Sequence, residues 1–240
     1  MGVQPKPRFD IIAFDADDTL WHCERLYVED QAQLRQQLAH YHSPDWIDER
    51  LFQTEMRNLQ HFGYGVKAFA LSMIETAVEL TEGRVTGREI QAIVDSARAM
   101  LSADVELLEH VADTLAHLAG AYTLMLITKG DLRDQEQKIA RSGLAGQFRA
   151  VEIVSDKRQE IYAALLQRHR VAPERFLMVG NSLRSDILPV LALGASAVYV
   201  PHEYTWAHEA ADLPLASQPG FYEIAHLGML PGLIASLEAG

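Results

Sequence analysis

The sequence contains a single cysteine, Cys23, among its 240 residues. One cysteine cannot form an intrachain disulfide and fits a reducing compartment, so we expect a cytoplasmic protein. No apolar run reaches the roughly 18 residues that a membrane span needs. Basic residues are outnumbered, with 21 Lys and Arg against 33 Asp and Glu and a net charge of -12. We therefore expect no nucleic-acid or membrane partner, while the oligomeric state is left open.

One stretch, residues 9–20, combines an apolar run of strand length with a cluster of acids. Ile11 to Phe14 is apolar, and Asp15, Asp17 and Asp18 follow within four residues. Carboxylates at this spacing repel one another and lose water when the strand before them is buried. The same pattern is also typical of a strand that ends in a solvated acidic turn, because Asp is common in turns. Whether these acids form a functional site or a solvated turn depends on the residues in the rest of the chain.

Residues 21–103 show almost no strand pattern. Apolar residues recur there at helical spacing, and Ser43 with Pro44 is typical of a helix start. The pair of glycines at 63 and 65 separates two of the helices. The pattern predicts helices over 27–39, 44–61, 66–80 and 86–101.

The remaining chain alternates between short apolar runs and amphipathic segments. Strands are expected over 122–127, 148–154, 176–179 and 197–200, the last one closing the sheet. Helices are expected over 105–118, 132–142, 159–170 and 186–193, with a terminal helix from Pro231. This alternation predicts an α/β fold with a doubly wound, Rossmann-like parallel sheet. We expect this core domain to comprise residues 1–20 and 104–240, with residues 21–103 inserted as an all-helical domain.

Polar residues follow each of four predicted strands at the point where the strand ends. In a parallel sheet these ends share one edge, which is where ligands bind. Four loops that together supply carboxylates, a hydroxyl and a cation favour a site over unrelated turns. The residues concerned are Asp15 and Asp17, Thr128, Lys157, and Asn181 with Asp186.

Phosphoryl transfer needs a nucleophile, positive charge, donors for the phosphate oxygens and an acid for the leaving group. Asp15 suits the nucleophile and would form an aspartyl-phosphate. Asp17 suits the acid that protonates the leaving oxygen and later activates water. Thr128 and Lys157 would bind the phosphoryl group.

Clustered carboxylates also indicate a hard cation with oxygen ligands, for which Mg2+ is the expected choice. The expected ligands are Asp15, Asp17, Asn181 and Asp186.

These residues resemble the motifs of the haloacid dehalogenase-like (HAD) hydrolase superfamily. Asp15, Asp17 and Thr19 match the first motif, DxDxT, and Thr128 ends the strand of the second. Lys157 stands where the third motif has its lysine, and the segment 179–187 resembles the fourth motif, GDSxxxD. The resemblance covers the whole chain and implies that the helical insert is a C1-type cap. Dehalogenases of the superfamily lack the second aspartate, so the presence of Asp17 implies the phosphatase branch.

The resemblance thus implies a Mg2+-dependent phosphatase acting on a small phosphorylated metabolite. A phosphotransferase or phosphomutase would share the same motifs and is the alternative. Asn181 replaces the usual Asp of the fourth motif and removes one negative charge. That change leaves a non-catalytic binding module as a third hypothesis. Lys157 lacks the proline that commonly follows it, so Lys129 and Arg158 are alternatives for its role.

In this family the cap selects the substrate, which directs attention to the loop 61–65. Its two glycines would present Tyr64, and Arg57 and Lys67 flank it. A plain connection between helices explains the same residues equally well. The expected substrate-binding residues are Thr128, Lys129, Lys157, Arg57 and Tyr64.

Overall fold

The computed structural model describes residues 7–209 and 218–239. The described chain divides into two compact units. The core unit comprises residues 7–22, 105–129, 138–209 and 218–239, and the helical unit comprises residues 23–104 and 130–137. No helix within the described ranges combines the length and the apolar character that crossing a membrane would require.

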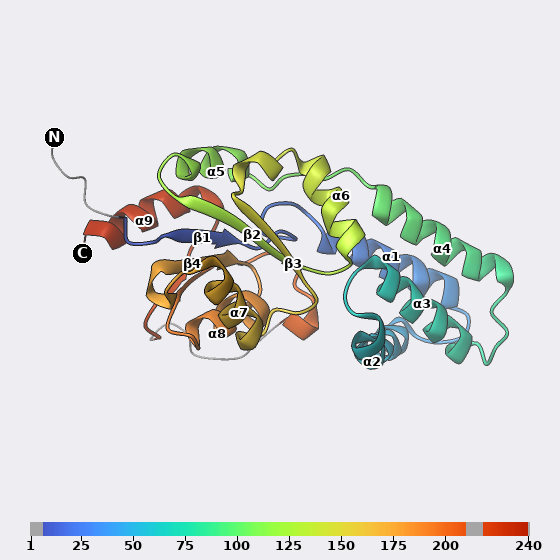
Figure 1. The fold of residues 1–240 in the computed structure, drawn as a ribbon. Coiled ribbons are helices and arrows are strands. Elements are labelled where there is room, and N and C mark those ends of the chain that lie inside the picture. The colour runs from blue at the N-terminus through green and yellow to red at the C-terminus, as the bar shows by residue number, and fades with distance from the viewer. Residues whose placement is uncertain (1–6, 210–217, 240) are drawn as a thin grey trace, which may run out of the picture. The chain divides into compact units, whose positions relative to one another are not determined.

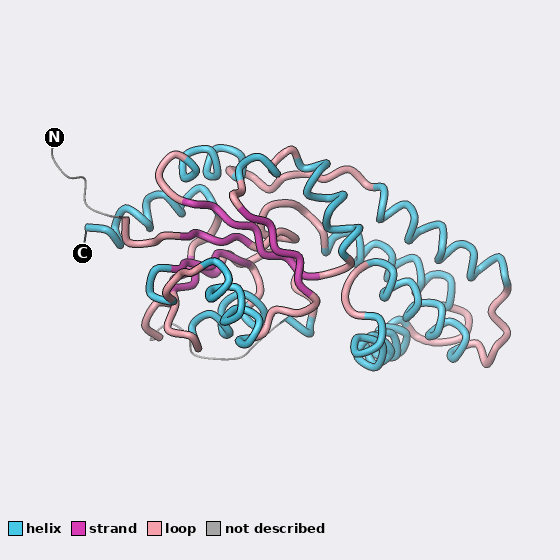
Figure 2. The backbone as a smooth tube through the Cα atoms, viewed as in Figure 1, coloured by secondary structure: helices cyan, strands magenta, loops and turns pink. Residues whose placement is uncertain are grey.

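A parallel sheet forms the centre of the core unit, with its strands in the order β3-β2-β1-β4-β5-β6 (Figures 1 and 2). β1 is buried along its whole length, as a central strand covered on both faces must be. Its neighbours are β2 on one side and β4 on the other, both parallel to it. The strands of the described chain are β1 (Ile11–Phe14), β2 (Thr123–Lys129), β3 (Ala150–Val154), β4 (Phe176–Gly180), β5 (Ser196–Tyr199) and β6 (Phe221–Glu223).

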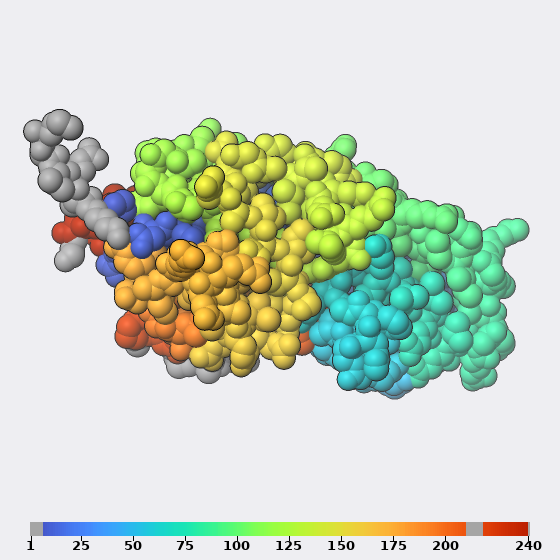
Figure 3. All heavy atoms as spheres, viewed as in Figure 1, coloured from blue at the N-terminus to red at the C-terminus, as the bar shows by residue number. Residues whose placement is uncertain are grey.

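Helices pack on both faces of the sheet, which confirms the doubly wound fold. α5 (Val111–Ala119) and α9 (Leu230–Ala239) cover one face, and α7 (Gln159–His169) and α8 (Leu188–Leu191) cover the other (Figure 1). Alternate side chains of β1 pack into the apolar layers on opposite faces of the sheet. Ile12 lies in the layer with α5 and α9, and Ala13 lies in the layer with α7 and α8. The space-filling view shows side chains occupying the space around the sheet that the ribbon leaves open (Figure 3).

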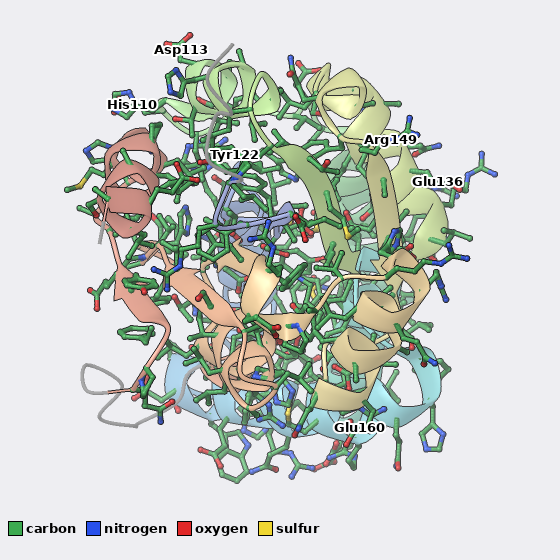
Figure 4. The ribbon with its side chains drawn as sticks, turned by 60° about the vertical axis from the view of Figure 1, so that its left-hand side comes forward. His110, Asp113, Tyr122, Glu136, Arg149 and Glu160 are labelled. Atoms are coloured by element: carbon green, nitrogen blue, oxygen red, sulfur yellow. The ribbon has the colours of Figure 1, made fainter. Side chains whose placement is uncertain are left out.

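The C-terminal helix is fixed to the start of β2 by one hydrogen bond. The Tyr122 hydroxyl donates to Glu238 Oε1 over 2.6 Å, and Figure 4 shows Tyr122 beside the sheet. Burial, together with the hydrogen bond to Glu238, raises the pKa of Tyr122 to about 12. The hydroxyl therefore stays protonated and keeps donating at physiological pH.

The helical unit contains the four helices that the sequence predicts, within a few residues at each end. They are α1 (Glu24–Leu38), α2 (Pro44–Phe62), α3 (Val66–Leu80) and α4 (Gly87–Ser102). Thr86 and Glu89 form a capping box at the start of α4, where each side chain accepts from the other residue's backbone N–H. α6 (Leu132–Ser142) begins in the helical unit and ends in the core unit.

The structure corrects three predicted elements. The helix expected from Val105 begins only at Val111, because the preceding backbone bonds to the chain after β1: His22 N–H donates to Glu106 and Leu108 N–H to Leu20. The strand near Ala197 is not the last, since β6 lies beside it. The helix expected over 186–193 is a π-helical turn, Leu183–Ile187, followed by the short α8.

Candidate active site

Asp15 lies where β1 ends, and the loop after it turns back sharply. The Asp15 backbone N–H donates to Val179 O on β4 over 2.9 Å, which fixes the residue to the sheet. Asp18 adopts a left-handed conformation with φ 58°, which Asp tolerates better than most residues. The turn brings Thr19 back to Asp15, where Thr19 Oγ1 donates to Asp15 Oδ2 over 3.0 Å.

Lys157 lies between two carboxylates, Asp15 and Asp186. Its ammonium donates to Asp15 Oδ1 and, over 2.7 Å, to Asp186 Oδ1, and all three side chains are buried. The other oxygen of Asp186 accepts from Ser182 N–H over 3.0 Å. Gly180 is required here, because a Cβ on it would lie 2.3 Å from Asp186 Oδ2.

This cluster contains two carboxylates, Asp15 and Asp186, and only one positively charged group, the Lys157 ammonium. Burial alone would lower the pKa of Lys157, but Asp15 and Asp186 outweigh it and hold that pKa well above its usual range. Burial raises the pKa of Asp15 to about 7, since the charge of Asp186 adds to the loss of water and Lys157 compensates only in part. The site therefore carries negative charge that a bound cation would neutralise.

Asn181 brings its side-chain amide to the same place. Its amide lies 3.3 Å from Asp15 Oδ2, 3.2 Å from the Asp17 carbonyl oxygen and 3.2 Å from Thr19 Oγ1. With its nitrogen inward, the amide donates to all three. With its oxygen inward, it accepts from Thr19 and faces the Asp15 Oδ2 and Asp17 carbonyl oxygens.

That oxygen cluster fits Mg2+, which prefers hard oxygen ligands. With the amide oxygen inward, Thr19 Oγ1 donates to both Asp15 Oδ2 and Asn181 Oδ1, and a cation would join the amide oxygen to the Asp17 carbonyl. In the described chain, no three His, Cys, Asp or Glu side chains are arranged around a common metal position. Oxygens of this kind suit Mg2+ when the Asn181 oxygen faces inward, whereas Asp186 is engaged by Lys157 and Ser182.

Asp17 is held by two residues of the core unit. Lys138 Nζ donates to both Asp17 oxygens over 2.7 Å, and Trp21 Nε1 donates to Oδ1 over 2.7 Å. Trp21 is 1% exposed and cannot move without opening the core. The Asp17 carboxylate is thus fixed two residues after Asp15, on the loop that Asp15 begins.

Thr128 and Lys129 end β2, the strand beside β1. Thr128 is buried at this edge of the sheet, and its part in phosphate binding remains a prediction. Lys129 donates to Ser185 Oγ over 2.7 Å and forms an ion pair with Glu209. Of the two alternatives to Lys157, Lys129 is therefore bound elsewhere, and Arg158 is 70% exposed and paired with Asp156.

The remaining predicted residues, Arg57 and Tyr64, belong to the helical unit. Arg57 donates to Thr54 Oγ1 over 3.0 Å and pairs with Glu75 and Glu79 on α3. Tyr64 lies in the turn between α2 and α3, flanked by glycines with positive φ. Their part in substrate binding remains a prediction.

Sequence reasoning missed Lys138, Trp21 and Glu209. Lys138 lies 121 residues from Asp17, within a helix whose pattern indicates only an amphipathic surface. Trp21 is four residues after Asp17. Residues four apart also lie side by side on a helix, so this spacing does not indicate a hydrogen bond between the two side chains. Glu209 lies in a loop with no strand or helix pattern, and no local signal marks it.

The model of the haloacid dehalogenase-like hydrolases matches residues 9–194. The chain belongs to the haloacid dehalogenase-like hydrolase family. The crystal structure of a haloacid dehalogenase-like family hydrolase from Xanthomonas campestris is similar to this one, and the two sequences are 40% identical. The two align with a TM-score of 0.88 over 99% of this chain and 95% of the other.

A more distant HAD-hydrolase, YfnB from Bacillus subtilis, shares the fold with a TM-score of 0.66 and 16% identity, over 95% of this chain and 99% of the other. That crystal structure is bound to magnesium. Among curated proteins, N-acylneuraminate-9-phosphatase of Rattus norvegicus is 26% identical over 174 residues, which make up 68% of this chain. The match spans 66% of that relative's length, just under two thirds.

Proposed function

We propose that this hydrolase is a Mg2+-dependent phosphatase that cleaves a small phosphomonoester through an aspartyl-phosphate on Asp15. One observation carries the proposal: a buried carboxylate beside Lys157 is followed, two residues on, by a second carboxylate that Lys138 and Trp21 fix. Such a pair supplies the nucleophile and the acid of phosphoryl transfer.

The proposed reaction has two steps. A carboxylate oxygen of Asp15 attacks phosphorus, the bond to the leaving oxygen breaks, and protonated Asp17 gives its proton to that oxygen. Asp17 then takes a proton from a water that attacks the same phosphorus, and the bond to Asp15 breaks. Asp15 is a carboxylate again and Asp17 is protonated again, so the site returns to its starting state.

The other residues would bind and orient the phosphoryl group. Lys157 places a positive charge beside Asp15, and the Thr128 hydroxyl would donate to a phosphoryl oxygen. Asp15, the Asp17 carbonyl and Asn181 would hold Mg2+, with Asp186 nearby through Lys157. The ion would neutralise charge on the phosphoryl oxygens.

The substrate is proposed only as a class. The proposed cap domain, residues 21–103, would select it through Arg57 and Tyr64, and Lys129 at the end of β2 would be a further contact residue. The rat relative is named for an N-acylneuraminate 9-phosphate, so phosphorylated sugar acids belong in any substrate panel. We place the activity in the cytoplasm because the chain has a single cysteine.

The test is hydrolysis of p-nitrophenyl phosphate and of a panel of phosphorylated metabolites, with Mg2+ and with EDTA. We expect phosphate release that requires Mg2+ and is lost in D15N. No release from any substrate by the folded protein would contradict the proposal. The same assay with added alcohol acceptors separates a phosphatase from a phosphotransferase or phosphomutase, which would give a new phosphate ester in place of free phosphate.

A further inference from the structure

Glu209 is a largely buried acid that the proposed reaction does not use. It ends a short helical turn, Ala207–Glu209, which follows β5 in the chain. Its side chain is only 12% exposed. A carboxylate buried to this degree is costly unless charges and donors compensate it, so its surroundings indicate its role.

Three donors surround the Glu209 carboxylate. Lys129 Nζ and Ser182 Oγ both donate to it, and Ser185 Oγ donates over 2.5 Å. Burial alone would raise the pKa of Glu209, but Lys129 and the three hydrogen bonds lower it to about 2. The group is therefore an ionised, hydrogen-bonded anion near neutral pH.

Each of these three donors is the chain neighbour of a site residue. Lys129 directly follows Thr128 at the end of β2. Ser182 directly follows Asn181, and Ser185 directly precedes Asp186, both in the turn after β4. A single carboxylate thus contacts the neighbours of the phosphate-binding hydroxyl, the amide and the second carboxylate.

The order of the strands in the sheet shows where these contacts of Glu209 lie relative to Asp15. β1 lies between β2 and β4, so Asp15 lies between the strand ends that Glu209 joins. Within this set of contacts, Lys129 also donates to Ser185 directly, but Glu209 alone reaches all three donors. Removing it takes this hydrogen bond from Ser182 and the ion pair with Glu209 from Lys129.

We propose that Glu209 is a positioning residue: by joining the ends of β2 and β4 across β1, it sets the spacing of Thr128, Asn181 and Asp186 around Asp15. It acts through Lys129, Ser182 and Ser185 and does not touch the reacting atoms. Its effect on the rate depends on the proposed phosphatase function, whereas its effect on the two loops does not. Small displacements matter here, since a misplacement of about 1 Å can cost on the order of 100-fold in rate.

The decisive variant is E209Q, which keeps the size of the side chain and one acceptor oxygen but removes the charge. The matched control is E136Q, which changes an exposed glutamate of α6 that is labelled in Figure 4. Both are measured as the full chain in three ways: kcat and KM for p-nitrophenyl phosphate, the urea midpoint, and amide hydrogen exchange of residues 128–130 and 181–187.

For E209Q we expect kcat to fall by about 10-fold to 100-fold while KM changes less than about threefold. Exchange should quicken in residues 128–130 and 181–187 but not in α7, and the control should match wild type. If E209Q does not fold, E209D serves the same test, since it keeps the charge but shortens the reach.

Unchanged kcat together with unchanged exchange in a folded E209Q would overturn the proposal. So would a loss of activity that follows only the fraction of unfolded protein, which would make Glu209 a general stability residue. If wild type hydrolyses no phosphomonoester, the proposed function fails, and the exchange experiment still decides: faster exchange in both loops supports the positioning role, and unchanged exchange refutes it.

Discussion

Lys138 Nζ lies 2.7 Å from both carboxylate oxygens of Asp17, a residue 121 positions earlier in the chain. The pair is largely buried, with side-chain exposures of 12% for Lys138 and 25% for Asp17. A cation held symmetrically on both oxygens fixes the orientation of the carboxylate as well as its place. The proposed acid of the reaction therefore depends on a residue from α6 that no motif contains.

Replacing Lys138 by Met should lower kcat by about 10-fold to 100-fold, because a mis-oriented acid loses part of the 100-fold to 10,000-fold that general acid catalysis contributes. Trp21 would remain as a donor, so the loss should stay smaller than that of D17N. Steady-state kinetics on p-nitrophenyl phosphate measure both variants. R168M, which removes a 64% exposed cation paired with Glu152, is the control and should leave kcat unchanged. Equal kcat for K138M and wild type would show that Asp17 needs no support from Lys138.

Asn181→Asp should strengthen Mg2+ binding, because it restores a negative charge to the cluster around Asp15 and the Asp17 carbonyl. We expect the Kd measured by calorimetry to fall by about tenfold, a change of about 1.4 kcal/mol. The metal concentration for half-maximal activity should fall with it. Unchanged or weaker binding by N181D would place Asn181 outside the ligand set.

Glu55 on α2 offers a pH test of stability. Burial raises the pKa of its carboxyl to about 7 from an ordinary 4.5, and among the described residues no ion pair or hydrogen bond offsets that burial. At this position the folded state thus binds a proton more tightly than the unfolded state, so the contribution of Glu55 to stability is greatest at low pH and falls as the pH rises from about 4.5 to about 7.

Glu55→Gln removes this dependence. The free energy of unfolding of E55Q relative to wild type should therefore increase between about pH 4 and about pH 8, by roughly 1–3 kcal/mol. The upper figure is a ceiling, because solvent reaches part of the side chain. Urea titrations of both proteins at the two pH values provide the measurement. A difference that is the same at both pH values would mean that Glu55 titrates normally.

Much of the fold follows from hydrophobic pattern alone. β1, β2 and β4 are fully or largely buried strands of a parallel sheet, so each appears in the sequence as an apolar run followed by polar residues. The rule that parallel strands end at one edge then brings Asp15 beside Lys157, as found. The family follows from the same residues and is shown by the match over residues 9–194.

The sequence could not predict features that depend on contacts between residues far apart in the chain. The segment before α5 has a helical pattern, but hydrogen bonds of Glu106 and Leu108 with residues 20–22 keep it out of the helix. A turn then follows, in which His110 adopts a left-handed conformation. β6 spans only Phe221–Glu223 and is half-exposed, too short to show a period. Lys138 and Glu209 become part of the site only through the folded chain.

The central claim is that Asp15 carries the phosphoryl group, and mass spectrometry of the acid-quenched enzyme during turnover tests it most directly. The account predicts a phosphorylated peptide containing Asp15 in wild type with Mg2+ and substrate. D15N should show neither the modification nor turnover, at an unchanged urea midpoint. Normal turnover by D15N, or a phosphoryl group found on a residue other than Asp15, would contradict it.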